Sequence, residues 1–170
     1  MTFMKLLVTA DIHIGRPASH LPAGVDGQYS TGDMWLRMVD YAIETKVDAV
    51  LASGDLTDSS NDYFEAYVKL EDGVRKLDAA GIRLFAVAGN HDYEVLPRLH
   101  ASIDSPHFVL LGRDNQWTHS VLEHEAEKLQ IFGWSFPKRI VTSTEDPLQY
   151  FPVADIDPDI PAIGMLHGDL

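Results

Sequence analysis

Apolar residues in the first ninety positions alternate between compact runs and a helical spacing. Residues 5–10, 49–52 and 83–88 form short apolar runs of the length expected for buried strands. Between them, residues 31–46 and 62–80 carry apolar side chains every three or four positions, which predicts two amphipathic helices. Strands that alternate with helices in this way predict a parallel sheet with right-handed crossovers, and therefore an α/β fold.

The helical patterns also predict which side chains face the core. In the first helix, Ser30 or Thr31 is expected to cap the start, and the predicted inward residues are Trp35, Met38, Val39, Ala42 and Ile43. In the second helix, which Gly81 should end, they are Phe64, Tyr67, Val68, Val74 and Leu77.

The remaining residues predict a loop and several short strands. Residues 11–30 are rich in Gly, Pro, Ser and Asp, so we expect a long loop there. Shorter strands are predicted at 108–111, 119–122, 129–133 and 162–166, and they either extend the first sheet or begin a second one. Neither a repeat nor a low-complexity tract interrupts the chain, which favours a single domain.

Polar clusters follow the predicted strands at the point where each one ends. They are Asp11-Ile-His13, Gly54-Asp-Leu-Thr-Asp58, Gly89-Asn-His-Asp92 and, after the last predicted strand, His167-Gly-Asp169. Ligands of open α/β sheets bind outside the carboxyl ends of the strands, so these clusters are expected at one edge of the sheet. Each cluster alone is a weak signal, and the second is also typical of a turn followed by a helix cap. Their order along alternating strands and helices is what indicates a functional site.

The side chains in these clusters indicate a metal site. Several carboxylates at one edge would raise each other's pKa values unless cations were present. The chain has no cysteine, so the ligands must be oxygen and imidazole nitrogen, a set suited to Mn, Fe or Zn more than to Ca. A central carboxylate can bridge two ions about 3.5–4 Å apart, as in two-metal phosphoryl-transfer sites.

In this order and at these spacings, the clusters closely resemble those of the calcineurin-like metallophosphoesterases. Asp11-Ile-His-Ile-Gly15, Ser53-Gly-Asp-Leu-Thr-Asp58 and Val87-Ala-Gly-Asn-His-Asp92 look most like the SbcD-type DNA repair exonucleases. Gly133-Trp-Ser-Phe-Pro137 and Leu166-His-Gly168 are also similar to that branch. The resemblance covers essentially the whole chain, and it implies the family's αββα four-layer sandwich, C-terminally incomplete in these residues.

The resemblance also implies a role for each residue of the clusters. The implied ligands are Asp11 and His13 for the first metal, Asp55 as the bridge, and Asn90 and His167 for the second metal.

Four further residues receive implied roles beside the metals. His91 would act near the leaving group as a general acid or transition-state stabiliser, and Asp92 would orient His91 and stabilise its charge. Asp58 would fix its loop through hydrogen bonds behind the ligands. Arg16 would contact a substrate phosphate or remain in solvent.

One motif of the family has no match in these residues. Residues 1–170 are therefore expected to be the N-terminal portion of a metallophosphoesterase nuclease domain without its final Gly-His-x-His motif. Each metal takes one ligand from that motif in the family, so we expect this chain to bind at most one ion well. Little nuclease activity and some self-association through uncovered surface should follow. Histidines 20, 100, 107, 119 and 124 lack the spacing to replace the motif and are interpreted as surface or satisfied polar residues.

The function expected from the resemblance is hydrolysis of DNA phosphodiesters. The enzyme would be an SbcD-type exonuclease in DNA repair that uses in-line attack by a metal-bridging hydroxide. Its cofactors would be two divalent ions, Mn²⁺ first, with Fe, Zn or Mg as alternatives. The implied partner of the full-length protein is an SbcC-type coiled-coil ATPase.

Composition supports some of these expectations and opens an alternative. The chain contains no run of eighteen apolar residues, so we expect no membrane span. The lack of cysteine favours a cytoplasmic location. The net charge of −13 fits poorly with DNA, whose binding releases counterions through Lys and Arg. A phosphoesterase of the same fold that acts on small nucleotides or other phosphate esters is therefore the alternative. A non-catalytic scaffold is a further alternative, although the intact His91–Asp92 pair and the early metal ligands disfavour it.

Overall fold

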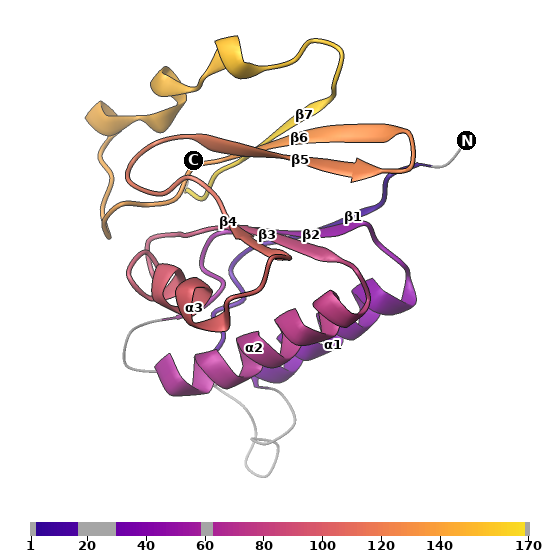
Figure 1. The fold of residues 1–170 in the computed structure, drawn as a ribbon. Coiled ribbons are helices and arrows are strands. Elements are labelled where there is room, and N and C mark those ends of the chain that lie inside the picture. Colours follow the sequence, from indigo (N-terminus) through magenta and orange to yellow (C-terminus); the bar gives the residue numbers. More distant parts are fainter. Residues whose placement is uncertain (1–2, 17–29, 59–62, 169–170) are drawn as a thin grey trace.

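The structure is a computed structural model that describes residues 3–16, 30–58 and 63–168 (Figure 1). Four parallel strands form the first sheet in the order β1-β2-β3-β4, namely β1 (Leu6–Thr9), β2 (Ala49–Ser53), β3 (Arg83–Val87) and β4 (Phe108–Leu110). A second, mixed sheet has the order β5-β6-β7, namely β5 (Thr118–His124), β6 (Glu127–Gly133) and β7 (Ala162–Met165). The α/β class and the parallel first sheet are confirmed. Of the shorter predicted strands, the first extends the first sheet and the others form the second.

The two sheets stack face to face, and helices cover the outer face of the first (Figure 1). These helices are α1 (Thr31–Glu44), α2 (Tyr63–Ala79) and α3 (Val95–Ile103). Three short 3-10 helices, η2 (Ser143–Glu145), η3 (Pro147–Tyr150) and η4 (Val153–Asp155), lie over the second sheet (Figure 1).

Strands β2 and β3 are buried on both faces, because successive side chains of a strand point to opposite sides of the sheet. Val50 and Leu84 pack against the helices in one apolar core. Leu51 and Phe85, the next residues of the same strands, pack against the second sheet in the other core. Two of the three compact apolar runs are therefore the central strands of a helix–sheet–sheet stack, and the first run forms the edge strand β1.

Helix α1 begins and packs as its sequence predicts. Ser30 is the N-cap, and its side chain accepts a hydrogen bond from the backbone N–H of Asp33 at 3.0 Å. Trp35, Val39 and Ala42 are fully buried on its inner face. The indole N–H of Trp35 donates to the carbonyl of Lys69 at 3.0 Å, which ties α1 to α2.

Helix α2 has part of its predicted inner face, but two of the predicted residues point outward. Phe64 and Val68, expected to face inward, are 82% and 61% exposed. Val74 and Leu77 are buried as predicted, and Tyr67 packs against the core. The rest of the buried face consists of Ala66, Leu70 and Gly73. A side chain at Gly73 would collide with the indole of Trp35, so α2 turns its small residues toward that ring.

Helix α3 was not predicted from the sequence. Its buried residues, Val95, Leu96, Leu99 and Ile103, do follow a helical spacing. Pro97 lies in its first turn, where backbone N–H groups have no partner within the helix, so the proline removes no hydrogen bond. In the described residues, no helix is both long enough and apolar enough to cross a membrane.

Candidate metal centre

The loops that follow β1, β2 and β3 emerge at the same edge of the first sheet. The register pairs Thr9 with Ala52 and Ser53 with Val87, so the three strands end side by side. Backbone hydrogen bonds continue this alignment into the loops. The N–H of Asp11 donates to Gly54 at 3.1 Å, and the N–H of His13 donates to the carbonyl of Asp55 at 2.9 Å.

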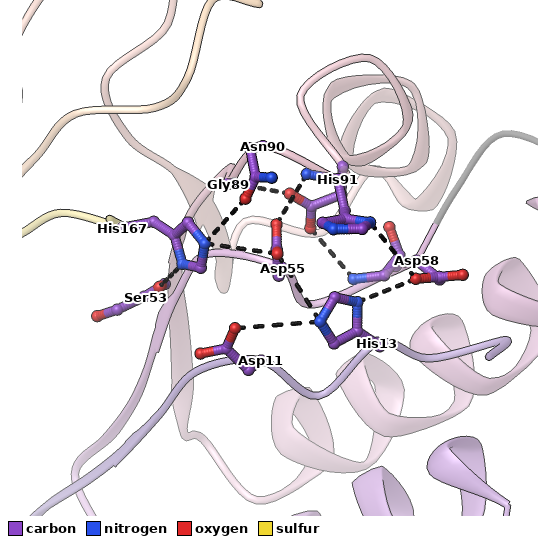
Figure 2. A network of polar contacts seen from close by, with 11 residues as sticks. Asp11, His13, Ser53, Asp55, Asp58, Gly89, Asn90, His91 and His167 are labelled. Carbon is purple, nitrogen blue, oxygen red and sulfur yellow. Dashed lines mark hydrogen bonds and ion pairs between the residues drawn. The ribbon is translucent and has the colours of Figure 1, made fainter. Parts of the chain in front are cut away.

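Asp55 lies between two imidazoles at the centre of this edge (Figure 2). Its Oδ2 is 3.7 Å from Nε2 of His13 and 3.4 Å from Nε2 of His167. Nε2 of His13 is also 4.0 Å from Oδ1 of Asp11, and Nε2 of His167 is 3.2 Å from Oδ1 of Asn90. The five predicted metal ligands therefore converge, with the carboxylate of Asp55 in the middle.

Each of the two imidazoles has its second nitrogen fixed by a neighbouring oxygen. Nδ1 of His167 donates to the carbonyl of Ser53 at 3.1 Å, and Nδ1 of His13 lies 3.0 Å from Oδ1 of Asp58. A hydrogen bond at Nδ1 selects the tautomer that leaves Nε2 for a metal. Asp58 therefore lies behind His13, on the side away from Asp55.

Asp92 does not lie where the sequence analysis expects a partner of His91. Its two carboxylate oxygens accept backbone N–H groups of Thr57 at 3.1 Å and Gly89 at 2.7 Å. The carboxylate near Nδ1 of His91 is Asp58, at 3.7 Å. Asp92 is fully buried and joins the second and third motif loops, whereas Asp58 stands beside both His13 and His91. This corrects the predicted contact, although the catalytic roles themselves stay predictions.

His91 lies at the rim of the centre. Its ring is 5.0 Å from that of His13 in an edge-to-face arrangement, and its side chain is 39% exposed. Its backbone N–H donates to Oδ1 of Asp55 at 2.9 Å, which leaves Oδ2 of Asp55 facing the two imidazoles. His91 can therefore meet a ligand from solvent while its backbone orients the central carboxylate.

Three of the converging residues have a left-handed backbone. The φ angles are 56° at Asp11, 50° at His13 and 50° at Asp55. Such angles are uncommon outside glycine and cluster at functional sites, where the surrounding structure holds them. The loops therefore keep side chains at positions where the backbone alone would favour glycine.

Two glycines leave room for the central side chains. A Cβ atom at Gly89 would collide with Oδ1 of Asp55, and one at Gly54 would collide with the ring of His167. Gly54 also has a φ of 89°. The second and third motifs therefore need glycine because the ligands pack directly against the backbone.

The central charges are strongly coupled. Burial raises the pKa of Asp55, but hydrogen bonds from His167 and from the backbone N–H of His91 outweigh it and hold the pKa below its usual value. The same contact with Asp55 raises the pKa of His167 to about 9. Burial raises the pKa of Asp92 to about 7. Asp55 is thus held as a carboxylate, the form that binds a cation.

The donor set fits a divalent metal. Asp11, His13 and Asp55 place one ligand atom each within 4.8 Å of one another, and so do His13, Asp58 and His91. Carboxylate oxygen with imidazole nitrogen is a set that transition-metal dications favour. The Nδ1 contacts of His13 and His167 supply the outer hydrogen bonds that metal-binding histidines require.

A match to a known protein family identifies the kind of protein that carries this site. Residues 4–170 match the family described as Calcineurin-like phosphoesterase. The chain belongs to the calcineurin-like phosphoesterase family. This family of hydrolases binds divalent metals, so the converging Asp, Asn and His side chains are its candidate ligands.

Two curated relatives of this phosphoesterase share part of their length with it. It is 28% identical over 176 residues to an uncharacterized metallophosphoesterase, YhaO, of Bacillus subtilis, and covers 42% of that protein. It is 29% identical over 89 residues, or 52% of its own length, to the DNA double-strand break repair protein Mre11 of Methanosarcina mazei, and covers 14% of that protein. The chain therefore spans less than half the length of these relatives.

Among solved structures, a dimetal phosphatase from Danio rerio aligns with 84% of the phosphoesterase chain and 48% of its own, at 16% identity and a TM-score of 0.48.

Other predicted residues lie outside this centre or beyond the described residues. Arg16 is exposed, and its backbone N–H donates to the carbonyl of His13 at 3.0 Å. His20 lies outside the described residues. The other histidines have local partners, as expected: Phe108 for His100, Asp78 for His107, Phe132 for His119 and Asp48 for His124.

The sequence pattern does not predict the residues that support His167. Its ring contacts that of Phe136 edge-to-face at 5.8 Å, and its Nδ1 bonds to Ser53. Phe136 belongs to the Gly133–Pro137 segment, one of the motifs that carry the resemblance, but it is far from His167 in the sequence, so the pattern alone does not predict the contact.

Proposed function

We propose that this phosphoesterase hydrolyses phosphodiester bonds of DNA, as an SbcD-type exonuclease in DNA repair. The observation that carries the proposal is the position of Asp55 Oδ2, 3.7 Å from Nε2 of His13 and 3.4 Å from Nε2 of His167. A carboxylate flanked by two imidazoles suits a bridge between two cations. Similarity over half of the chain to archaeal DNA double-strand break repair proteins supports DNA as the substrate.

The residues of the centre would have two roles, which are to bind cations and to transfer a proton. Asp11 and His13 would hold one ion and Asn90 and His167 the other, with Asp55 shared between them. Two bound divalent ions would polarise the phosphoryl oxygens and supply an activated water for in-line attack. His91, exposed at the rim, would protonate or charge-stabilise the leaving oxygen.

In the full-length protein, two substitutions separate the ligand role from the acid role. Asp55→Asn should abolish metal binding and turnover together, because it removes the shared anionic ligand. His91→Ala should leave Mn²⁺ affinity nearly intact, while turnover falls by roughly 10²–10⁴-fold, the range for a positioned acid or base. Calorimetric Mn²⁺ titration with hydrolysis assays would measure both. Loss of metal from His91→Ala as severe as from Asp55→Asn would contradict this division.

The substrate class needs its own comparison. The full-length protein should hydrolyse linear DNA and a phosphodiester dye with Mn²⁺ faster than a phosphomonoester dye. The net charge of −13 favours a second candidate, a phosphoesterase for small nucleotides, because phosphate backbones attract Lys and Arg. Activity on nucleotides or monoesters without any activity on DNA would support this candidate and contradict the first.

The assembly and location follow from the resemblance alone. We propose that the full-length protein binds an SbcC-type coiled-coil ATPase in the cytoplasm. Copurification of the tagged full-length protein with such an ATPase would support this assembly, and its purification without one would count against it.

A further inference from the structure

A second hollow lies at the opposite end of the parallel sheet from the metal centre. It is lined by the turns that lead into β2 and β3 and by the end of β5, and its volume is about 600 Å³. Figure 1 shows these turns and the β5–β6 hairpin at the end of the molecule where β2 and β3 begin. Small-molecule sites in proteins usually have volumes of about 300–1,000 Å³. The hollow is therefore large enough for a ligand of nucleotide size.

Basic side chains gather in this hollow, although the chain as a whole carries a net charge of −13. The lining includes Lys46, Arg83, His107 and His124. Arg83 donates to the carbonyl of Val121 at 3.4 Å. Within the described residues, neither Lys46 nor Arg83 forms an ion pair with a carboxylate. Lys128, and to a smaller extent Arg83, lower the pKa of the Glu123 carboxyl, so the charge of Arg83 is partly shared with Glu123. The charge of Lys46 is available to an anion.

The two acidic residues of the lining already have partners. Asp48 places Oδ1 2.7 Å from Nδ1 of His124, and its Oδ2 accepts the backbone N–H of Lys5 at 2.6 Å. Glu123 forms an ion pair with Lys128 at 2.7 Å. Because both carboxylates are bound to cations or donors, they oppose an incoming anion less than free carboxylates would.

Helices α1 and α2 both end beside the hollow, and helix C-termini carry partial negative charge. Hydrogen bonds neutralise much of it here. The carbonyl of Thr45 accepts Nζ of Lys5 at 2.7 Å, and that of Ala42 accepts the backbone N–H of Val47 at 3.1 Å. The carbonyl of Leu77, near the end of α2, accepts the backbone N–H of Ile82 at 2.9 Å. The helix ends therefore present few free acceptors to a ligand.

Lys46 occupies a backbone position that favours glycine. Its φ is 53°, whereas the equivalent turn after α2 uses Gly81 with a φ of 72°. A left-handed conformation costs a non-glycine residue about 1–2 kcal/mol. A lysine at this strained turn beside the hollow supports a binding role for its ammonium group.

The geometry points to a binding site for a small organic phosphate of mononucleotide size in this hollow. Lys46 and Arg83 would hold the phosphate group. Ile43 and Leu122, which also line the hollow, offer an apolar wall for the rest of the molecule. This site is separate from the metal centre and does not depend on the proposed nuclease activity.

Calorimetric titration with AMP in the presence of EDTA tests the site, because EDTA removes the metals that would hold a phosphate at the other centre. AMP should bind saturably, and inorganic phosphate should compete with it more weakly. Lys46→Gly should weaken AMP binding at least tenfold while the fold becomes more stable, since glycine relieves the left-handed turn. Arg83→Met should weaken binding by a similar factor.

Two control variants separate this site from general charge effects and from the metal centre. Arg75→Gln removes one positive charge from the surface of α2, where the side chain is 69% exposed, and should change AMP affinity less than twofold. Asp55→Asn, a substitution at the metal centre, should also leave AMP affinity in EDTA unchanged. No saturable AMP binding, or unchanged affinity in both Lys46→Gly and Arg83→Met, would overturn the proposal. Binding of an oligonucleotide but not of AMP at these residues would equally overturn it.

Discussion

Oδ1 of Asp58 lies 3.0 Å from Nδ1 of His13, and the same oxygen is 3.7 Å from Nδ1 of His91. One carboxylate thus stands behind both a candidate metal ligand and the candidate acid. Its position couples the orientation of the two rings. Such outer carboxylates fix the tautomer of a ligand and raise its basicity.

The first prediction concerns this carboxylate. Asp58→Asn keeps the shape of the side chain but removes its charge, so Mn²⁺ affinity should fall about 10–100-fold. The free energy of unfolding without metal should change little, because the side chain is partly exposed. Calorimetry and urea unfolding in EDTA would measure the two effects. Wild-type affinity in Asp58→Asn would show that His13 does not depend on this contact.

The second prediction is that Asp92, unlike Asp58, contributes clearly to the stability of the fold. Asp92→Ala removes the acceptor of the buried backbone N–H groups of Thr57 and Gly89. Each buried donor without a partner costs about 1–3 kcal/mol, so the free energy of unfolding should fall clearly. Urea unfolding in EDTA would measure the loss, with Asp58→Ala as the comparison. An equal or smaller loss than in Asp58→Ala would contradict the structural role of Asp92.

A third prediction uses the close packing at Gly89. Gly89→Ala should displace Asp55 and so abolish tight Mn²⁺ binding, because the new Cβ collides with the carboxylate. Gly164→Ala is the matched control, since a Cβ there meets no described atom within 4 Å. Metal titration of both variants would compare them. Equal Mn²⁺ affinity in the two would mean that Asp55 is not held as tightly as its contacts indicate.

The left-handed backbone of Asp11 gives a fourth prediction. Its side chain is 62% exposed and its φ is 56°, so little packing is lost when it is replaced. Asp11→Gly should be more stable than Asp11→Ala by about 1 kcal/mol, because only alanine has a Cβ that strains this conformation. Thermal or urea unfolding in EDTA would rank them. The reverse ranking would show that the loop changes conformation when the aspartate is removed.

His100 provides a prediction on pH. Burial lowers the pKa of His100 below its usual value of 6.5, and the bond of its Nε2 to the carbonyl of Phe108 offsets this only in part. The unfolded chain therefore binds the proton more readily, and this residue makes stability fall as pH drops through about 6.5. His100→Gln should show a shallower loss of unfolding free energy between about pH 7.5 and 5. Identical slopes would contradict the prediction.

The position of the site could be predicted from the sequence because it depends on the order of apolar strands and polar residues along the chain. Asp11, Asp55 and Asn90 each follow a compact apolar run, and parallel strands bring such positions to one edge. The contact between Asn90 and His167, 77 residues apart, followed from the family resemblance rather than from the pattern.

Contacts that depend on side-chain direction could not be predicted. Asp92 is next to His91 in the sequence but turns to buried backbone, while Asp58 approaches the ring from another loop. The apolar spacing of α2 predicts Phe64 and Val68 inward, but both are exposed. The buried face of the helix is determined by the close packing of Gly73 against Trp35. A glycine is not counted as an apolar position, so the hydrophobic pattern does not reveal this contact.

The metal centre lies across the joint between the two sheets. Asp55 follows β2 of the first sheet, and His167 follows β7, the edge strand of the second. An ion held by both would therefore be a reversible cross-link between the two layers, in addition to their apolar packing and to polar contacts such as that between Asp48 and His124. By thermodynamic linkage, its binding free energy would add to the cohesion of the sheets. Chelation should then loosen β7 first, and amide hydrogen exchange should become faster in Ala162–Met165 while the doubly buried β2 and β3 remain protected.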